Sequence, residues 1–496
     1  MRSLPVFAIL LALLTSAALG QGWAGQQMIN RPDMDTCDLY ASIAFDATGR
    51  PWVVWSKNLS DSTLVYSRWD GDRWTPQQGV GANAPGVDSR LRASLCFDAS
   101  GRAWLTWTNL NLDNSLDVAS CFWTDSGWSP EVRVNTPDAD SFNAVSQIGC
   151  GGGQVWCVWS GGRNGSSNLS VCASRWDDAV GAWGPEMRVS PPDGNLHWFT
   201  DLAVDATGTP HAVWSTYPLY TVFYSHFDGQ QWVAPIPVND TTQVMASPQA
   251  DPHLAIDRDG VMHLSFTGAR VGALHRDIFY TLNDGSGWSP CQMITRDSLY
   301  DEWYSDIAVD RRDNVWIAWE RQGEGTDQFR IYAAHFDGEL WSTEQRLDND
   351  SAYYDVSAAL ALDIRGNPWV VWDGITYTAG NYDIYLNRYL TSGALDETAS
   401  CAPATREPSL RALMTGTGRT RFCYTVPTTG VARIDIYDRL GRRVHSLTGM
   451  HLAAGQHTAE WNGRTLNGKS APTGTYVCRL QAVGMNATCS FVLLSQ

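Results

Sequence analysis

Short stretches of alternating apolar and polar residues, separated by turn-forming residues, fill most of the chain. In the first such unit, residues 42–45, 51–55 and 64–67 alternate in this way, and an Asp-x-x-Gly turn separates the first two. Alternation over four to eight residues between turn signals predicts short β-strands. A second turn and a short segment that begins with tryptophan complete the unit. Each unit is therefore expected to contain four strands.

This unit recurs seven times at intervals of 52 to 55 residues. An aromatic pair three residues apart marks the second strand of five units: Trp52/Trp55, Trp104/Trp107, Trp156/Trp159, Trp316/Trp319 and Trp369/Trp372. His211/Trp214 and His263/Phe266 occupy the same place in units four and five. Four strands in about fifty residues are typical of one propeller blade. The sequence therefore predicts an all-β chain with a seven-bladed β-propeller over residues 21–390.

The fourth strand of the seventh unit is missing from its expected place. The first six units each supply a tryptophan that opens this strand: Trp74, Trp128, Trp183, Trp232, Trp288 and Trp341. Residues 23–30, which begin with Trp23, resemble residues 288–295 instead. Because an open ring would leave unpaired strand edges, we expect the N-terminal segment to pair with the strand around Ile384 and to close the last blade.

The first twenty residues read as a signal peptide, with Arg2 before an apolar stretch and a small-x-small site at residues 18–20. We expect a secreted or outer-surface protein without a membrane span, since no later segment approaches eighteen apolar residues. The formal charge of −17 disfavours nucleic acids and anionic membranes as partners. It is compatible with neutral glycans or Ca²⁺, although no cofactor and no metal site are specifically indicated.

The pattern changes after residue 390. Residues 391–412 lack periodicity and are expected to be a linker. Residues 413–496 alternate again, and their short strands predict a small Ig-like β-sandwich. The segments YTVPTTGVARIDIYDRLGRRV, LAAGQHTAEWNGRTLNGKSAPTGTYVCRL and FVLL resemble the Ig-like domain of flagellar hook-capping proteins and the related type IX secretion sorting domains. The resemblance implies a Gram-negative bacterium and export through the bacterial secretion machinery.

The turns before the fourth strands, such as Asp70-Gly71 and Asp337-Gly338, occupy the place of the Asp-box turns of sialidase-like propellers. The N-terminal part resembles these propellers in a degenerate form. Polysaccharide lyases with seven blades are a second resemblance, which would place His197, His253 and Tyr304 in the active site. Neither resemblance assigns a catalytic residue.

Candidate ligand-binding residues lie at the starts of the first strands, which meet at one end of a propeller's channel. They are Asp38, Tyr40, Arg92, His197, Asp201, Asp251, His253, Glu302, Tyr304 and Asp306. Loops after the second strands add charged residues such as Glu320 and Asp373. Carboxylates and histidines could serve general acid–base chemistry, Arg92 could hold an anionic group, and aromatics including Trp198 and Trp303 could stack on sugars. Alternatively, these residues only line a water-filled channel mouth.

Two functional classes follow from this pattern. The first is a secreted binding or scaffold propeller for glycans or other extracellular ligands, exported through its C-terminal domain. The second is an extracellular glycan-active enzyme, either a sialidase-like glycoside hydrolase or a polysaccharide lyase.

Three of the eleven cysteines lie in unit three, at positions 150, 157 and 172. A turn centred in residues 151–154 would place Cys150 opposite Cys157, and a turn near residue 164 would place Cys157 opposite Cys172. Facing antiparallel residues are close enough for a disulfide. The row of three thiols could hold one disulfide, remain reduced, or bind a metal, although a flat row suits a tetrahedral ion poorly.

Overall fold

The computed structural model divides the chain into two compact units, residues 23–389 and residues 390–496 together with 1–22. The structure describes residues 22–30, 37–57, 63–81, 87–137, 142–162, 169–247, 250–296, 300–323, 328–349, 352–376, 381–390, 409–414, 420–426, 429–438, 442–452, 455–465, 469–472, 474–483 and 485–493. Every regular element in these ranges is a β-strand, which confirms the all-β class. The expected signal peptide lies outside the described residues.

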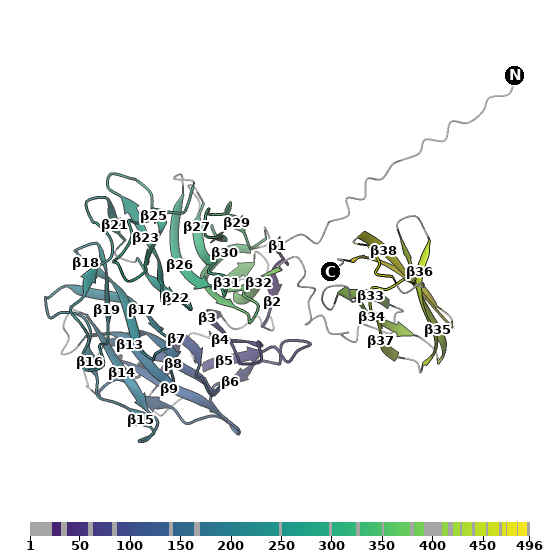
Figure 1. The fold of residues 1–496 in the computed structure, drawn as a ribbon. Helices are drawn as coiled ribbons and strands as arrows, with labels where there is room; N and C mark the ends of the chain where they lie inside the picture. The colour runs from purple at the N-terminus through teal and green to yellow at the C-terminus, as the bar shows by residue number, and fades with distance from the viewer. Residues whose placement is uncertain are drawn as a thin grey trace. The chain divides into compact units, whose positions relative to one another are not determined.

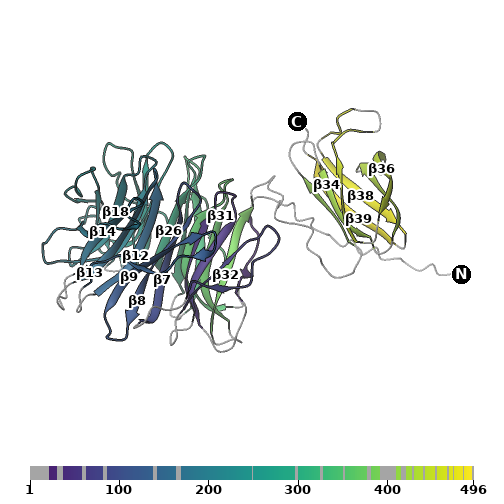
Figure 2. The same cartoon turned by 90° about the horizontal axis from the view of Figure 1, so that it is seen from below.

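The larger unit repeats one pattern of paired strands along the chain (Figures 1 and 2). The first strands are β3 (Asp38–Phe45), β7 (Val87–Phe97), β12 (Phe142–Gly151), β17 (Leu196–Val204), β22 (His253–Ile256), β26 (Asp301–Val309) and β30 (Ala352–Leu362). The second strands are β4 (Pro51–Lys57), β8 (Ala103–Asn111), β13 (Gln154–Gly162), β18 (Pro210–Tyr217), β23 (Met262–Arg270), β27 (Val315–Gln322) and β31 (Pro368–Thr376). Each first strand pairs antiparallel with the second strand that follows it.

The outer half of each repeat is also regular. The third strands are β5 (Thr63–Arg68), β9 (Leu116–Thr124), β14 (Ser170–Asp177), β19 (Thr221–His226), β24 (Asp277–Asn283), β28 (Phe329–Phe336) and β32 (Tyr382–Leu390). Short outer strands follow in the first six repeats: β6 (Gln78–Gly79), β10 (Gly127–Trp128), β11 (Val132–Arg133), β15 (Ala182–Trp183), β16 (Met187–Arg188), β20 (Ile236–Pro237), β25 (Gln292–Met293) and β29 (Gln345–Arg346). Repeat five has an extra strand, β21 (Val244–Ala246), beside β23.

Neighbouring repeats contact one another in a circular order. The first strands are in contact along the series β3, β7, β12, β17, β22, β26 and β30, and β30 in turn contacts β3. A hydrophobic cluster that includes Val53 and Trp55 of the first repeat with Trp369 and Val371 of the last joins these two repeats. This arrangement is propeller-like, since each sheet packs its faces against two neighbours.

The N-terminal segment supplies the outer strands of the seventh repeat. Strands β1 (Gly22–Trp23) and β2 (Gln27–Met28) both pair with β32, and the Ile29 amide donates a hydrogen bond to the Ile384 carbonyl. Figure 1 shows this as purple β1 and β2 beside green β32. The predicted pairing of residues 23–30 with the strand that contains Ile384 is confirmed.

Tryptophans of the outer strands pack against aromatic side chains of the preceding repeat. Trp128 lies edge-on to Trp52 at 6.3 Å between ring centroids, and Trp183 lies edge-on to Trp104 at the same separation. Trp23 contacts Trp316 in the same way, also at 6.3 Å. Trp23 therefore fills, for the last repeat, the place that the later tryptophans fill in the others.

The expected row of cysteines in repeat three is wrong. Gly151 pairs with Gln154 across a tight turn at Gly152 and Gly153, both with positive φ, so Cys150 faces Val155 and Cys157 faces Ile148. Cys157 faces Ser174, and Cys172 faces Trp159. The turn is centred between Gly152 and Gly153, one residue earlier than a Cys150–Cys157 pair requires, and this shifts every pair.

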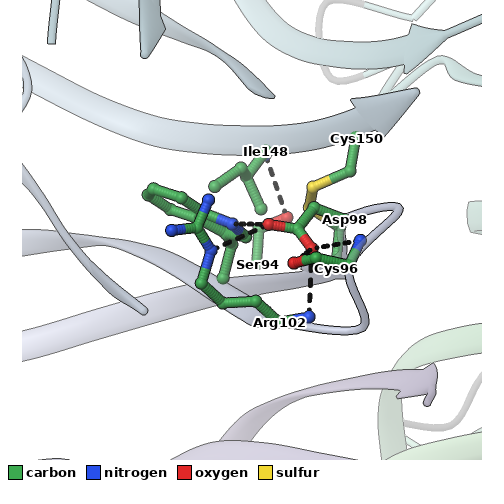
Figure 3. Close-up of a disulfide and its surroundings, with 8 residues drawn as sticks. Ser94, Cys96, Asp98, Arg102, Ile148 and Cys150 are labelled. Atoms are coloured by element: carbon green, nitrogen blue, oxygen red, sulfur yellow. Dashed lines mark hydrogen bonds and ion pairs between the residues drawn. A yellow bond between two sulfur atoms is a disulfide. The ribbon is translucent and has the colours of Figure 1, made fainter. Parts of the chain in front are cut away.

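Cys150 instead forms a disulfide with Cys96 of the neighbouring repeat, with a Cα–Cα separation of 6.2 Å (Figure 3). Beside it, the Ile148 amide donates a hydrogen bond to Ser94 Oγ at 3.2 Å, so a covalent and a polar link join β7 to β12.

The smaller unit contains two sheets. One has the order β33 (Ser409–Met414), β34 (Thr420–Val426), β37 (Gly455–Trp461), and the other β36 (Arg443–Leu452), β35 (Gly430–Asp438), β38 (Gly474–Ala482), β39 (Met485–Leu493). Its core is built around Phe422, Ile434, Ile436, Trp461 and Tyr476, all nearly inaccessible to solvent. Strand β33 begins within the segment expected to be a linker, and residues 391–408 lie outside the described residues.

Candidate functional site

One residue in each repeat has left-handed backbone geometry, with φ between 41° and 59°. These residues are Tyr40, Arg92, Val145, Phe199, Asp251, Tyr304 and Ser357. In six repeats the residue falls at a break in the register between the first and second strands, and in repeat five Asp251 lies between β21 and β22. A bulge of this kind inserts an extra residue and turns side chains in a new direction. We call this position the bulge residue.

The bulge residues surround one cavity of about 720 Å³. Six of the seven line it, and Phe199 is the exception. Residues two positions after the bulge also line it: Ser42, Gln147, Asp201, His253, Asp306 and Ala359. The cavity volume lies within the range of about 300–1,000 Å³ that is usual for ligand sites. Non-glycine residues with positive φ are strained and cluster at functional sites, so this cavity is the candidate site.

Seven of the ten candidate residues from the sequence meet in this cavity: Tyr40, Arg92, Asp201, Asp251, His253, Tyr304 and Asp306. Each of them is a bulge residue or lies two positions after one. The structure thus brings together residues from repeats one, two, four, five and six.

The other three candidates, Asp38, His197 and Glu302, lie two positions before a bulge and are buried outside the cavity. The Trp214 indole N–H contacts His197 Nδ1 at 3.1 Å, and the Trp319 indole N–H donates to Glu302 Oε2 at 2.8 Å. Asp38 accepts a hydrogen bond from Asn30. Reading alternate residues assumed an unbroken strand; the bulge changes which residues face the cavity.

His253 is surrounded by three carboxylates. Its Nδ1 lies 3.3 Å from Asp306 and 3.8 Å from Asp201, and its Nε2 lies 3.8 Å from Asp251. Burial disfavours a charged imidazole, but Asp306 and Asp201 outweigh it and hold the pKa of His253 well above its ordinary value. Asp201 and Asp306 also accept hydrogen bonds from the Leu254 and Leu360 amides of the next repeats, at 2.8 and 2.7 Å.

The opposite part of the lining combines a cation with aromatic rings. Arg92 is exposed, and its guanidinium lies 4.5 Å from the centre of the Tyr40 ring. Within the part of the chain that the structure describes, Arg92 forms no side-chain hydrogen bond or ion pair. Burial, with Asp251 and Glu320 nearby, raises the pKa of Tyr304 to about 12, so its phenol keeps its proton at neutral pH.

Two further carboxyl groups lie beside the bulge residues. Glu320 lines the cavity and accepts a hydrogen bond from the Ser357 amide. Asp373 accepts hydrogen bonds from the amides of Tyr40 and Ala41 at 2.7 and 3.3 Å, and so links the last repeat to the first. Burial raises the pKa of Asp373 to about 7 and that of Glu320 well above its usual range.

Several lining residues lie outside the ten candidate ligand-binding residues. Trp303 and Glu320 were expected from the sequence, as a stacking aromatic and as a charged residue after a second strand, and both line the cavity. The residues that were missed are Phe329, Tyr354, Ser357 and Tyr382. Ser357 is a bulge residue, so the period of 52 to 54 residues between bulges would have found it. Phe329, Tyr354 and Tyr382 come from strand ends and carry no such signal.

Among the described ranges, no group of three or more His, Cys, Asp or Glu side chains is arranged to hold a metal ion. The described residues also include no helix of the length and apolar character that a membrane span requires.

Comparison with known proteins identifies the smaller unit. Residues 410–485 match the family model described as the FlgD Ig-like domain. The C-terminal unit is therefore similar to this family in sequence as well as in its two-sheet fold. No curated protein sequence matches the chain.

Several solved structures resemble the chain at low sequence identity. An ulvan lyase of a new polysaccharide lyase family, solved with -[GlcA(1-4)Rha3S]-, is 10% identical with a TM-score of 0.50, covering 74% of this chain and 95% of its own. The NanB sialidase of Streptococcus pneumoniae is 12% identical with a TM-score of 0.41, covering 74% and 70%. PorZ, a surface component of the type IX secretion system of Porphyromonas gingivalis, is 15% identical with a TM-score of 0.44, covering 92% and 59%. The likeness to the lyase concerns the fold alone.

Proposed function

We propose that this chain is a secreted seven-bladed propeller whose central cavity binds a short glycan with an anionic group. The observation that carries the proposal is the ring of bulge residues. Seven repeats place a strained residue at one position, and six of these residues line one cavity although they differ in size and charge. A purely structural ring would favour similar residues, and a residue such as glycine would relieve the strain.

The lining suits a sugar ring. Tyr40, Trp303, Tyr304, Tyr354 and Tyr382 offer aromatic faces, and carboxylates and hydroxyls lie among them. Ligand sites commonly combine aromatic walls with a few polar groups that fix orientation. Sugars match this combination because their C–H faces pack on aromatic rings while their hydroxyls form hydrogen bonds.

Arg92 supports an anionic group on the ligand. Its guanidinium stacks on Tyr40 and keeps its donors free of other described side chains. A guanidinium held in this way is suited to bind a carboxylate or a sulfate through paired hydrogen bonds.

Binding is favoured over catalysis by the protonation states of the cavity groups. A lyase that used His253 or Tyr304 as its base would need one of them deprotonated, yet the pKa of His253 is raised and that of Tyr304 lies at about 12. Both groups therefore hold their protons at neutral pH. The glycan-active enzyme stays the second candidate, and bond cleavage during the binding test below would favour it.

The test is a glycan array probed with the propeller and with two arginine variants. Arg92→Ala should lose binding to acidic glycans by tenfold or more. Arg258→Ala, which removes an exposed arginine paired with Asp313 in a turn, should bind as the wild type does. Wild-type protein that binds no glycan, or an Arg92→Ala variant that binds normally, would contradict the proposal.

We further propose that the C-terminal unit serves export. The match of residues 410–485 to the FlgD Ig-like model and the type IX sorting resemblance support this role. Removing residues 413–496 should leave a folded propeller that no longer reaches the medium of its native host. Normal export of the truncated protein would refute the sorting role.

A further inference from the structure

Glu320 departs from the repeat at a position where five other repeats carry a serine or a threonine. The residue after the second aromatic of the second strand is a hydroxyl residue in five repeats: Ser56, Thr108, Ser160, Ser215 and Thr267. Only repeats six and seven place a carboxyl group there, at Glu320 and Asp373. All seven residues are buried, so a hydroxyl satisfies the fold and the two acids need another explanation.

Asp373 has a structural explanation, because both of its oxygens accept amide hydrogen bonds from the first repeat. Glu320 differs. Its Oε1 accepts from the Ser357 amide, and its Oε2 makes no hydrogen bond to any residue that the structure describes. Glu320 is only 2% exposed, and it lines the cavity. Unlike the hydroxyl residues at this position, Glu320 reaches the cavity wall, and a nearly buried carboxyl group with one oxygen unpaired among the described residues there points to a partner on the ligand.

Burial favours the protonated form of Glu320. It raises the pKa of Glu320 well above the usual range, Asp373 and Asp251 add to this, and the Ser357 amide and Arg92 oppose it. The phenol of Tyr304 interacts with the same group. Glu320 therefore keeps its proton to higher pH than an ordinary glutamic acid, and a protonated carboxyl group is a strong hydrogen-bond donor.

We propose that Glu320 and Arg92 together bind a carboxylate of the ligand, with Glu320 donating a hydrogen bond and Arg92 supplying the positive charge. Both side chains line one cavity, and the charge of Arg92 acts on the pKa of Glu320, so an anion bound in this part of the cavity would lie near both groups. The inference rests on the proposed glycan-binding function and adds to it the chemical class, a carboxylated sugar, and a dependence on pH. Sulfates are weaker acceptors than carboxylates and gain less from a carboxylic acid donor.

Whether the affinity for the ligand rises or falls with pH depends on the proton of the Glu320 carboxyl group. The donor is present below the pKa of Glu320 in the free protein and is lost as pH rises through that pKa. Above it, the ionised Glu320 repels the ligand carboxylate. Affinity should therefore fall as pH rises, whereas a site that used arginine alone would hold its affinity over the same range.

The experiment titrates glucuronate, methyl glucoside and glucose 6-sulfate into the full mature chain between pH 5 and pH 9. Glu320→Gln retains a neutral donor, so it should bind glucuronate as tightly as the wild type at pH 6 and lose the pH dependence. Glu320→Ala should bind at least tenfold more weakly. Glu339→Gln, the same change at an exposed glutamate in a turn outside the cavity, should keep the wild-type pH dependence. Thermal melts of each variant verify folding.

Two results would overturn the inference while leaving glycan binding intact: glucuronate affinity that is flat with pH in the wild type, or equal losses in Glu320→Gln and Glu320→Ala. Tighter binding of the sulfated sugar would also overturn it. Failure of the proposed function would look different, since the wild type would then bind none of the three sugars at any pH.

Discussion

The bulge residue is the single position on which the candidate site depends. Left-handed geometry is unfavourable for residues with a side chain because Cβ approaches the backbone, and β-branched residues suffer most. Val145 nevertheless adopts it, with φ of 54°. Because register, turn and neighbouring repeats hold the bulge in place, the strain is stored at the cavity wall. The identity of each bulge residue is therefore free to follow the ligand and not the fold.

Substitutions at Val145 measure this strain. Glycine in a strand is usually less stable than alanine by about 0.5–1 kcal/mol. At Val145 the order should reverse, with Val145→Gly more stable than Val145→Ala by about 1 kcal/mol, since only glycine escapes the left-handed penalty. Chemical denaturation of both variants provides the measurement. The usual order, alanine above glycine, would show that the backbone at residue 145 is not left-handed in solution.

His253 gives the cavity wall a pH dependence of its own. Its pKa is raised in the folded protein because Asp306 and Asp201 outweigh its burial. Its contribution to stability is therefore fully present below the pKa of an unfolded histidine and declines as pH rises through the folded pKa. The melting temperature gap between the wild type and His253→Gln should be larger at pH 6 than at pH 9.

His275→Gln, a change at a more exposed histidine, is the control and should show a small gap at both pH values. A gap for His253→Gln that is constant with pH would mean that the imidazole is not charged in the folded state.

Among the elements, the N-terminal segment has the largest structural role for its length. It pairs with β32, places Trp23 against Trp316 and Tyr389, and contributes Asn30, which donates hydrogen bonds to Asp38 and Asp383. Without it the last sheet would end at β32 with an unpaired edge and an uncovered apolar face.

Two variants in this segment test its role. Trp23→Ala should lower the free energy of unfolding by about 2–4 kcal/mol, somewhat less than a fully buried tryptophan because Trp23 is half-buried. Gln27→Ala, an exposed position of β2, should cost under about 0.5 kcal/mol. Deleting residues 21–31 should cost at least as much as Trp23→Ala. An unchanged melting temperature after the deletion would defeat the closure.

The disulfide between Cys96 and Cys150 links β7 to β12 across a sequence separation of 54. Restricting an unfolded chain over a loop of this length stabilises the native state by about 4 kcal/mol in the chain-entropy model. Cys96→Ser should therefore melt well below the wild type, and a reductant should lower the melting temperature of the wild type without affecting the variant. Cys291→Ser should melt as the wild type does. Insensitivity of the wild type to reductant would argue against the bond.

At the scale of the whole molecule, the repeat could be predicted because large aromatic side chains recur at the same position in each unit. The aromatic pairs, the Asp-x-x-Gly turns and the outer tryptophans recur with little variation, and the displaced Trp23 segment shows how the last sheet is completed. The turn aspartates are visible for a physical reason: Asp46, for example, accepts hydrogen bonds from the amides of Thr48 and Arg50. The C-terminal unit could be predicted from its motifs.

The details that were missed depend on single-residue shifts. The prediction of the cysteine register was wrong because the glycine turn is centred one residue earlier than a Cys150–Cys157 pair requires. Asp38, His197 and Glu302 were placed beside the true lining residues because no glycine marks the bulge, and alternation read across it goes out of phase. Period and residue type reveal the fold, whereas one inserted residue decides which side chains reach the cavity.

The most direct test of a ligand-binding cavity compares two tryptophans at equivalent positions, each one residue before a bulge. Trp303 lines the cavity, and Trp198 does not. Calorimetric titration with the tightest acidic glycan from the array should show Trp303→Ala weakened by tenfold or more, while Trp198→Ala binds as the wild type does. Wild-type affinity in Trp303→Ala, or an equal loss in Trp198→Ala, would contradict the assignment of this cavity as the site.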